Sequence, residues 1–117
     1  MRRVIGLAVL LAALPATAQA ADGSHIFQLQ CKGCHGGKPG DPAPPLAGVF
    51  GSRIASKPDF AYSAGIKART GVWDATSLDA FLTAPSKFVP GTAMPKPPGL
   101  TTQKDRAAVI DYLKTLH

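Results

Sequence analysis

The sequence predicts a small all-α domain in which three to five helices are joined by long loops. Apolar residues recur at helical spacing in several short segments, whereas no stretch alternates like a half-buried strand. The 117 residues also include 12 glycines and 11 prolines, which end helices and form turns. A chain of this length has room for one domain, and no repeat or second domain is visible.

The first twenty residues are predicted to be an export signal that is cleaved, so that the domain spans residues 21–117. Two arginines at the start are followed by an apolar run over residues 4–14 and by a small-x-small cleavage site that ends at Ala20. A membrane anchor is the alternative, but this run is shorter than the roughly 20 residues that cross a bilayer. We therefore expect a periplasmic protein without a membrane span.

Charge and composition narrow the class of protein further. The chain has 13 Lys and Arg against 7 Asp and Glu, a net charge of +6, which falls to +4 when Arg2 and Arg3 leave with the signal. The remaining cations are scattered, which argues against nucleic acid as a partner. Strongly apolar residues are sparse in the domain, so a bound apolar group would help to offset a backbone entropy of about 1–2 kcal/mol per residue.

The first half of the domain is predicted to contain two short helices separated by a loop. Asp22 or Ser24 can cap a helix that runs into a cysteine motif. Residues 36–45 are rich in Gly and Pro and must form a loop. A second short helix fits within residues 59–68.

The second half is predicted to contain two longer helices. Asp74 or Thr76 can cap a helix that ends before Pro85. Residues 85–99 are rich in proline, and we expect them to be extended. Thr101 or Thr102 then caps a last helix. Its apolar residues are Val109, Tyr112, Leu113 and Leu116. Loops this long argue against an ordinary domain unless another group orders them.

The run Cys31-Lys32-Gly33-Cys34-His35 carries the chemistry. A disulfide is one alternative for two cysteines in an exported protein. A thioredoxin-like dithiol would need a βαβ pattern, which is missing. A zinc site would need four ligands. C-x-x-C-H is instead the attachment signature of haem c. Two thiols on one turn reach the vinyl groups on one porphyrin edge, and His35 then lies under the iron as a ligand. We predict one covalent haem c.

Met94 is the strongest candidate for the second iron ligand. It is the only methionine after the signal, and it lies in a turn-rich loop over residues 90–95 that offers no helix face to fill. His25 is close to the cysteine motif and His117 is the final residue, so we interpret both as surface histidines. An open iron face in place of Met94 would suit a haem peroxidase or gas sensor.

A longer set of residues supports a family resemblance. These residues are Gly23 and Phe27 ahead of the cysteine motif, Pro44-Pro45-Leu46-Ala47-Gly48-Val49-Phe50-Gly51, Phe60-Ala61-Tyr62, Trp73, Leu82, Pro85, Pro90-Gly91-Thr92-Ala93-Met94-Pro95 and Tyr112-Leu113. With them, essentially all of residues 21–117 resembles the class I cytochromes c, in particular the mitochondrial and bacterial c2-like branch. The resemblance implies a soluble, non-enzymatic carrier of single electrons by outer-sphere transfer, or a dedicated haem c subunit of a periplasmic dehydrogenase.

The resemblance also implies roles for single residues. Met94 would be the sixth ligand of the iron through its sulfur. The carbonyl group of Pro44 would accept a hydrogen bond from Nδ1 of His35 and so fix the imidazole tautomer. Tyr62 and Trp73 would hydrogen-bond a haem propionate.

Other implied roles and departures concern the surroundings of the haem. Thr92 would lie beside the ligand loop, and Gly23 would let the first helix cross closely over the last. Ser52 stands where the family usually has a basic residue after the Phe-Gly step, with Arg53 one place later. Ile66 replaces a polar residue, often Asn, near the methionine.

Lysines that flank the cysteine motif and the methionine loop are expected to steer acidic redox partner proteins. The candidates are Lys32, Lys38, Lys87 and Lys96. The alternative for each is an ordinary solvated lysine. We expect the protein to be a monomer or one subunit of a heterodimer.

Overall fold

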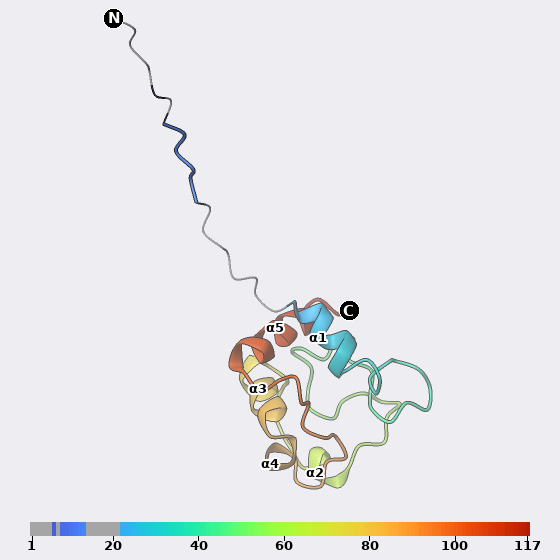
Figure 1. Cartoon of the computed structure of the whole chain (residues 1–117). Coiled ribbons are helices and arrows are strands. Elements are labelled where there is room, and N and C mark those ends of the chain that lie inside the picture. The colour runs from blue at the N-terminus through green and yellow to red at the C-terminus, as the bar shows by residue number, and fades with distance from the viewer. Residues whose placement is uncertain (1–5, 7, 14–21) are drawn as a thin grey trace, which may run out of the picture.

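The chain is represented by a computed structural model that describes residues 6, 8–13 and 22–117, and the described part is helical (Figure 1). The helices are α1 (Gly23–Gln30), α2 (Ala64–Lys67), α3 (Ala75–Thr83), α4 (Pro85–Phe88) and α5 (Gln103–Leu113). Within the described ranges, the one extended pairing is an isolated antiparallel bridge between Arg53 and Val72. The predicted all-α class with three to five helices is confirmed. No helix in these ranges is long and apolar enough to cross a membrane.

Side chains that cap the helices decide between the alternatives left by the sequence. Asp22 caps α1, because its carboxylate accepts a hydrogen bond from the backbone N–H of Ser24 at 3.0 Å. Asp74 caps α3 and forms a reciprocal capping box with Ser77. Thr102 caps α5 by accepting a hydrogen bond from the N–H three residues later at 3.2 Å. Each long helix therefore starts where a polar side chain satisfies a free backbone donor.

The segment after the third helix corrects one prediction. Residues 85–99 are not extended throughout, because Pro85–Phe88 forms α4. Proline is compatible with the first turn of a helix, where its missing N–H has no partner to lose. The backbone N–H groups of Phe88 and Val89 close this turn on the carbonyl oxygens of Ala84 and Pro85, at 3.1 and 2.8 Å. The same proline thus follows one helix and begins the next.

The first and last helices cross at very short range. α1 packs on α5, and α3 packs on both α5 and α4. A Cβ atom added to Gly23 would lie 2.1 Å from the carbonyl oxygen of Ala108 and 3.0 Å from Cβ of Tyr112. The rings of Phe27 and Tyr112 pack beside this crossing, with centroids 5.2 Å apart. The structure therefore provides the close crossing at Gly23 that the resemblance implies.

Gly23→Ala is expected to destabilise the protein by about 3 kcal/mol or more, because the methyl group can be accommodated only if the two helices move apart. For a domain of about 100 residues this lowers the melting temperature by at least roughly 12 °C. Gln28→Ala, on the exposed side of the same helix, is the control, and we expect it to change the stability by less than about 0.5 kcal/mol. Urea unfolding of the holoprotein measures both. Equal stabilities of the two variants would contradict the close crossing.

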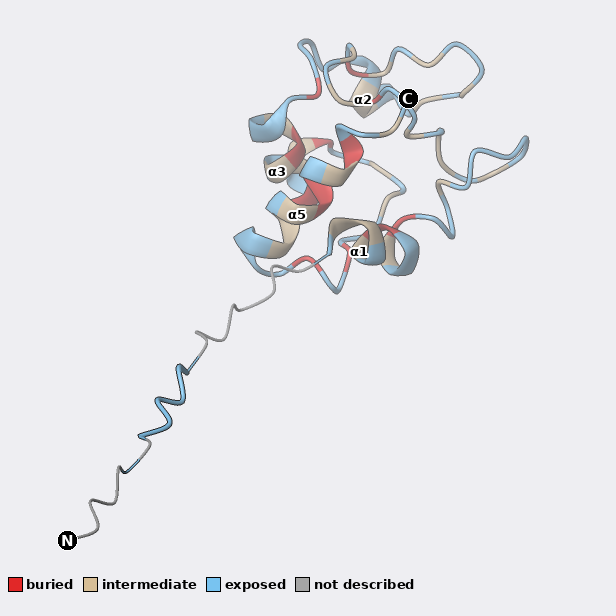
Figure 2. Cartoon of the chain, turned by 90° about the horizontal axis from the view of Figure 1, so that it is seen from above, coloured by how far each residue is buried: buried red, intermediate tan, exposed pale blue. Residues whose placement is uncertain are grey.

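The buried residues of the core lie on α1, α3 and α5, which pack together, and in the segments between the helices (Figure 2). Arg106 on α5 is tied to Asp79 on α3 through an N–H of its guanidinium at 2.7 Å, and it also donates to the carbonyl oxygen of Leu100 at 3.2 Å. Residues from the loops over 36–63 and 89–101 line a cavity together with residues of α3 and α5.

Candidate haem site

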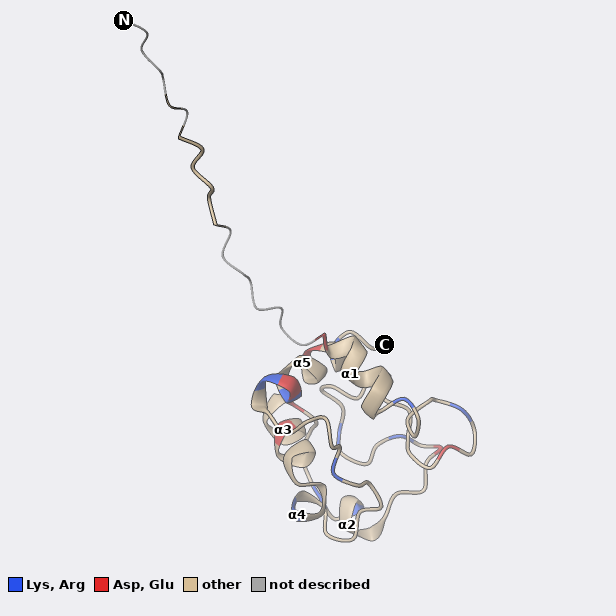
Figure 3. Ribbon diagram, viewed as in Figure 1, with Lys and Arg blue, Asp and Glu red and all other residues tan. Residues whose placement is uncertain are grey.

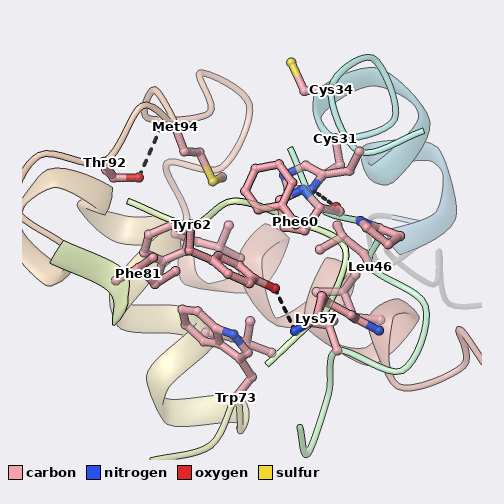
Figure 4. Close-up of a pocket in the computed structure, with 18 of the residues that line it drawn as sticks. Cys31, Cys34, Leu46, Lys57, Phe60, Tyr62, Trp73, Phe81, Thr92 and Met94 are labelled. Carbon is pink, nitrogen blue, oxygen red and sulfur yellow. Dashed lines mark hydrogen bonds between the residues drawn. The ribbon is translucent and has the colours of Figure 1, made fainter. Parts of the chain in front are cut away.

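A cavity of about 470 Å³ lies between the helices and the long loops (Figure 4). Pockets for cofactors and small ligands measure roughly 300–1,000 Å³ and are mostly apolar. The apolar lining comes from distant parts of the chain and includes Leu46, Val49, Trp73, Phe81 and Leu82. The cavity is large enough for the bound apolar group that the sparse apolar composition of the domain predicts.

Cys31 and Cys34 line one end of the cavity, and neither forms a disulfide. α1 ends at Gln30, and the N–H groups of Cys34 and His35 donate to the carbonyl oxygen of Cys31 at 3.2 and 2.9 Å, so the chain continues as a turn. Burial raises the pKa of the Cys31 thiol to about 11. Reactive cysteines of dithiol oxidoreductases have lowered pKa values, so this environment does not favour the dithiol alternative.

His35 is held with one ring nitrogen available to a metal. Its Nδ1 lies 2.7 Å from the carbonyl oxygen of Pro44, and a carbonyl can only accept, so Nδ1 carries the proton and Nε2 has a free lone pair. Burial lowers the pKa of the imidazole, against smaller opposing effects of the Pro44 hydrogen bond and the charge of Asp41. The neutral ring is the form that binds metals.

Met94 reaches the same cavity from the loop that precedes α5. Its side chain extends toward the interior, and its backbone N–H donates to Oγ1 of Thr92 at 3.3 Å (Figure 4). The N–H of Thr92 in turn donates to the carbonyl oxygen of Val89, which is completely buried. The loop that carries Met94 is therefore anchored to the core. His25 and His117 do not line the cavity.

Tyr62 and Trp73 lie at the end of the cavity away from the cysteines (Figure 4). Trp73 is only 7% exposed, and backbone hydrogen bonds fix it, since its N–H donates to the carbonyl oxygen of Ser52 at 2.8 Å. The Tyr62 hydroxyl oxygen accepts a hydrogen bond from the backbone N–H of Lys57 at 3.1 Å. Burial raises the pKa of this hydroxyl, and the Lys57 hydrogen bond partly opposes that. The hydroxyl hydrogen is thus retained and free to donate.

Lys57 is a cavity residue that no sequence motif predicted. It lines the cavity beside Tyr62, and its ammonium group donates to the carbonyl oxygen of Ala47. Arg53 lines the same cavity, so two cations reach the region where Ser52 replaces the usual basic residue. The sequence offered one signal for Lys57, which is its position between the Phe-Gly step and Tyr62. Its contact with Ala47, ten places earlier, depends on the fold.

Comparison with known proteins agrees with a small helical protein built around a C-x-x-C-H haem attachment site. The cytochrome c family model matches residues 20–117. Cytochrome c of Tetrahymena pyriformis is 46% identical over 99 residues, which cover 83% of this chain and 88% of that protein. Cytochrome c2 of Rhodomicrobium vannielii is 41% identical over 100 residues, which cover 81% of this chain and 77% of that protein.

A third similar protein is the cytochrome c-type cyt cy of Rhodobacter capsulatus, which is 41% identical over 102 residues covering 86% of this chain and 50% of that protein.

The chain belongs to the cytochrome c family, as a class I cytochrome c, and it carries one covalently attached haem c. The cavity fits this group, because it combines an apolar lining with two cysteine side chains outside any disulfide, an imidazole whose Nε2 has no other partner and a thioether. A protein of this class is an electron carrier.

Proposed function

We propose that this protein is an exported, periplasmic carrier of single electrons, in which Cys31 and Cys34 hold the haem while His35 and Met94 bind its iron. The observation that carries the proposal is that these four side chains, from opposite ends of the domain sequence, line one cavity. The bound haem supplies a one-electron couple between ferrous and ferric iron. If His35 and Met94 both bind the iron, no substrate needs to reach the metal.

The surrounding residues hold and tune the two axial ligands. The hydrogen bond from His35 to Pro44 fixes the tautomer that leaves Nε2 for iron. The thioether of Met94 would be a soft ligand that favours the ferrous form and raises the reduction potential. Tyr62 and Trp73 line the cavity, and the O–H and N–H groups of their side chains would donate hydrogen bonds to a haem propionate. These positions support a carrier more than a peroxidase or gas sensor.

Export is supported by the start of the chain. The described part of the predicted signal includes Leu10 and Leu11, which are 91% and 90% exposed, so these apolar side chains take no part in the core. The family match begins at residue 20, beside the predicted cleavage site after Ala20, which lies outside the described residues. The similarity to a bacterial cytochrome c2 also favours the periplasm.

The spectrum of the purified holoprotein tests the proposed ligands and function together. We expect a low-spin ferric haem with the weak far-red band of sulfur-to-iron charge transfer, uptake of one electron per chain, and no rapid binding of carbon monoxide by the reduced protein. A missing far-red band with rapid carbon monoxide binding would instead indicate an open iron face and a ligand-binding or peroxidase function.

The charge distribution supports steering by lysines. Most acidic residues lie on or cap α1, α3 and α5: Asp22, Asp74, Asp79, Asp105 and Asp111 (Figure 3). The candidate lysines lie elsewhere, three in loops and Lys87 on α4, and all four are exposed. A negatively charged partner would therefore be guided toward the side of the cysteine motif and the methionine loop.

Oxidation by ferricyanide, a small trivalent anion, is expected to slow several-fold when ionic strength rises, because salt screens its attraction to the exposed lysines. Oxidation by a trivalent cobalt phenanthroline cation should accelerate instead. Lys32→Glu with Lys96→Glu should reduce the ferricyanide rate more than Lys104→Glu, which changes a lysine on α5. Stopped-flow measurements give these rates. Rates that are independent of salt for both reagents would count against steering by the lysines.

A further inference from the structure

The segment that follows Met94, over residues 95–99, is poor in backbone hydrogen-bond donors. It contains three prolines, which have no backbone N–H, so only Lys96 and Gly99 can donate from the main chain. Each proline also fixes φ near about −65°, which makes the segment stiff. A stiff segment moves as one unit, so a restraint at Gly99 also acts on Met94 at its other end.

Gln30 forms the one hydrogen bond that joins this segment to another element among the described residues. Its Oε1 accepts a hydrogen bond from the backbone N–H of Gly99 at 3.3 Å, across 69 positions of the sequence. The other hydrogen bond of the segment is local and runs from the N–H of Leu100 to the carbonyl oxygen of Pro97 at 3.3 Å. The attachment of residues 95–99 by hydrogen bonding therefore depends on a single side chain.

The chain on either side of the segment is held separately. Before Met94, the N–H of Thr92 donates to the carbonyl oxygen of Val89 at 3.1 Å. After it, Arg106 donates to the carbonyl oxygen of Leu100 at 3.2 Å, and Leu100 is completely buried. Local opening of a protein begins where the fewest interactions hold the chain. Residues 95–99 are therefore the part of this loop that opens most easily.

The packing around Gly99 fits a close contact with the Gln30 amide. A Cβ atom added to Gly99 would lie 2.7 Å from Nε2 and 2.9 Å from Cδ of Gln30. The φ angle of Gly99 lies outside the left-handed region, so the amide group, and not the backbone conformation, leaves no room for a side chain. Gln30 ends α1, directly before Cys31, and it lines the cavity together with residues 96–98. The contact therefore links the cysteine motif to the methionine loop.

We propose that Gln30 is a positioning residue that holds the segment after Met94 against the end of α1, and that it thereby keeps the iron closed to small ligands. The inference rests on the proposed function, in which Met94 binds the iron. An external ligand can then bind only when Met94 has moved away, and its apparent affinity follows the fraction of open protein. Removing one ordinary hydrogen bond raises that fraction about fivefold. Gln30 acts here without touching the iron.

Titration of the ferric holoprotein with imidazole, followed by the haem spectrum, tests this role. We expect Gln30→Ala to bind imidazole about fivefold more tightly than the original chain. Gln28→Ala changes an exposed glutamine of the same helix and should change the affinity by less than about twofold. Gln30→Glu keeps an oxygen acceptor at the same place, so it should also stay within about twofold of the original chain. This rescue separates the hydrogen bond from an effect on the helix.

A double-mutant cycle with Gly99→Ala tests the contact itself. The added methyl group displaces the Gln30 amide, so Gly99→Ala alone should raise the imidazole affinity about fivefold, and it should have little effect in Gln30→Ala. Additive effects, unchanged affinity in Gln30→Ala, or no rescue by Gln30→Glu would overturn the proposal. If Met94 is not a ligand, the original chain will instead bind imidazole as tightly as Met94→Leu, and the proposed function will fail together with the role of Gln30.

Discussion

Cys31→Ala combined with Cys34→Ala is expected to leave a chain that has no stable fold. Without the thioether bonds the haem is no longer fixed in a cavity of about 470 Å³. Leaving such a cavity empty costs up to about 11 kcal/mol at about 24 cal/mol per Å³, an upper bound because water can enter. The net stability of a typical domain is only about 5–15 kcal/mol. The haem therefore serves as a large part of the core.

Far-UV circular dichroism and urea unfolding of the double variant, purified without haem, measure this effect. We expect a weak helical signal and no cooperative transition. Each single cysteine variant keeps one possible thioether bond and serves as the control, with an expected intermediate stability. A haem-free double variant that unfolds cooperatively would show that the protein chain forms its own core and would contradict the role assigned to the haem.

The elements that could be predicted from sequence depend on local signals. α1, α3 and α5 each begin one residue after a capping side chain that the sequence offers, and α3 ends before Pro85 as expected. The choice between Thr101 and Thr102 could not be made in advance, because either hydroxyl can cap a helix. The structure uses Thr102, which places Val109 and Leu113 on the buried face of α5.

The features that the sequence did not predict depend on contacts between distant segments. α4 has only four residues, and Phe88 packs against Trp73 and Arg69 rather than within its own helix. Lys57 reaches Ala47, and Arg106 reaches Asp79, across turns whose geometry is set by the whole fold. No local pattern encodes such pairs, because their energy arises only after the domain has assembled.

The candidate site likewise has features that local sequence signals predict and features that depend on contacts between distant segments. The cysteine motif predicted haem attachment directly from its spacing, and elimination among the few available ligands selected Met94. The hydrogen bond between His35 and Pro44 joins residues nine positions apart in a glycine- and proline-rich loop, and it was expected only from the family resemblance.

Met94→Ala is expected to lower the reduction potential, since it removes the thioether that we propose as the iron ligand and that would favour ferrous iron. A shift of the ferrous–ferric equilibrium by more than tenfold corresponds to a fall of more than about 59 mV for one electron. The ferric protein should lose its far-red band, and the reduced protein should bind carbon monoxide rapidly. Spectroelectrochemical titration and flash photolysis measure these changes.

Met94→Leu separates binding of the iron from packing, because it keeps the volume of the side chain and removes the sulfur. Exchanges between Leu and Met usually cost less than about 1.5 kcal/mol, so this variant should stay close to the original stability. If Met94 binds the iron, Met94→Leu will have the same lowered potential and open iron face as Met94→Ala. If Met94 only fills space beside Thr92 and the anchored loop, Met94→Leu will restore the original potential and spectrum, and the proposed ligand set will be wrong.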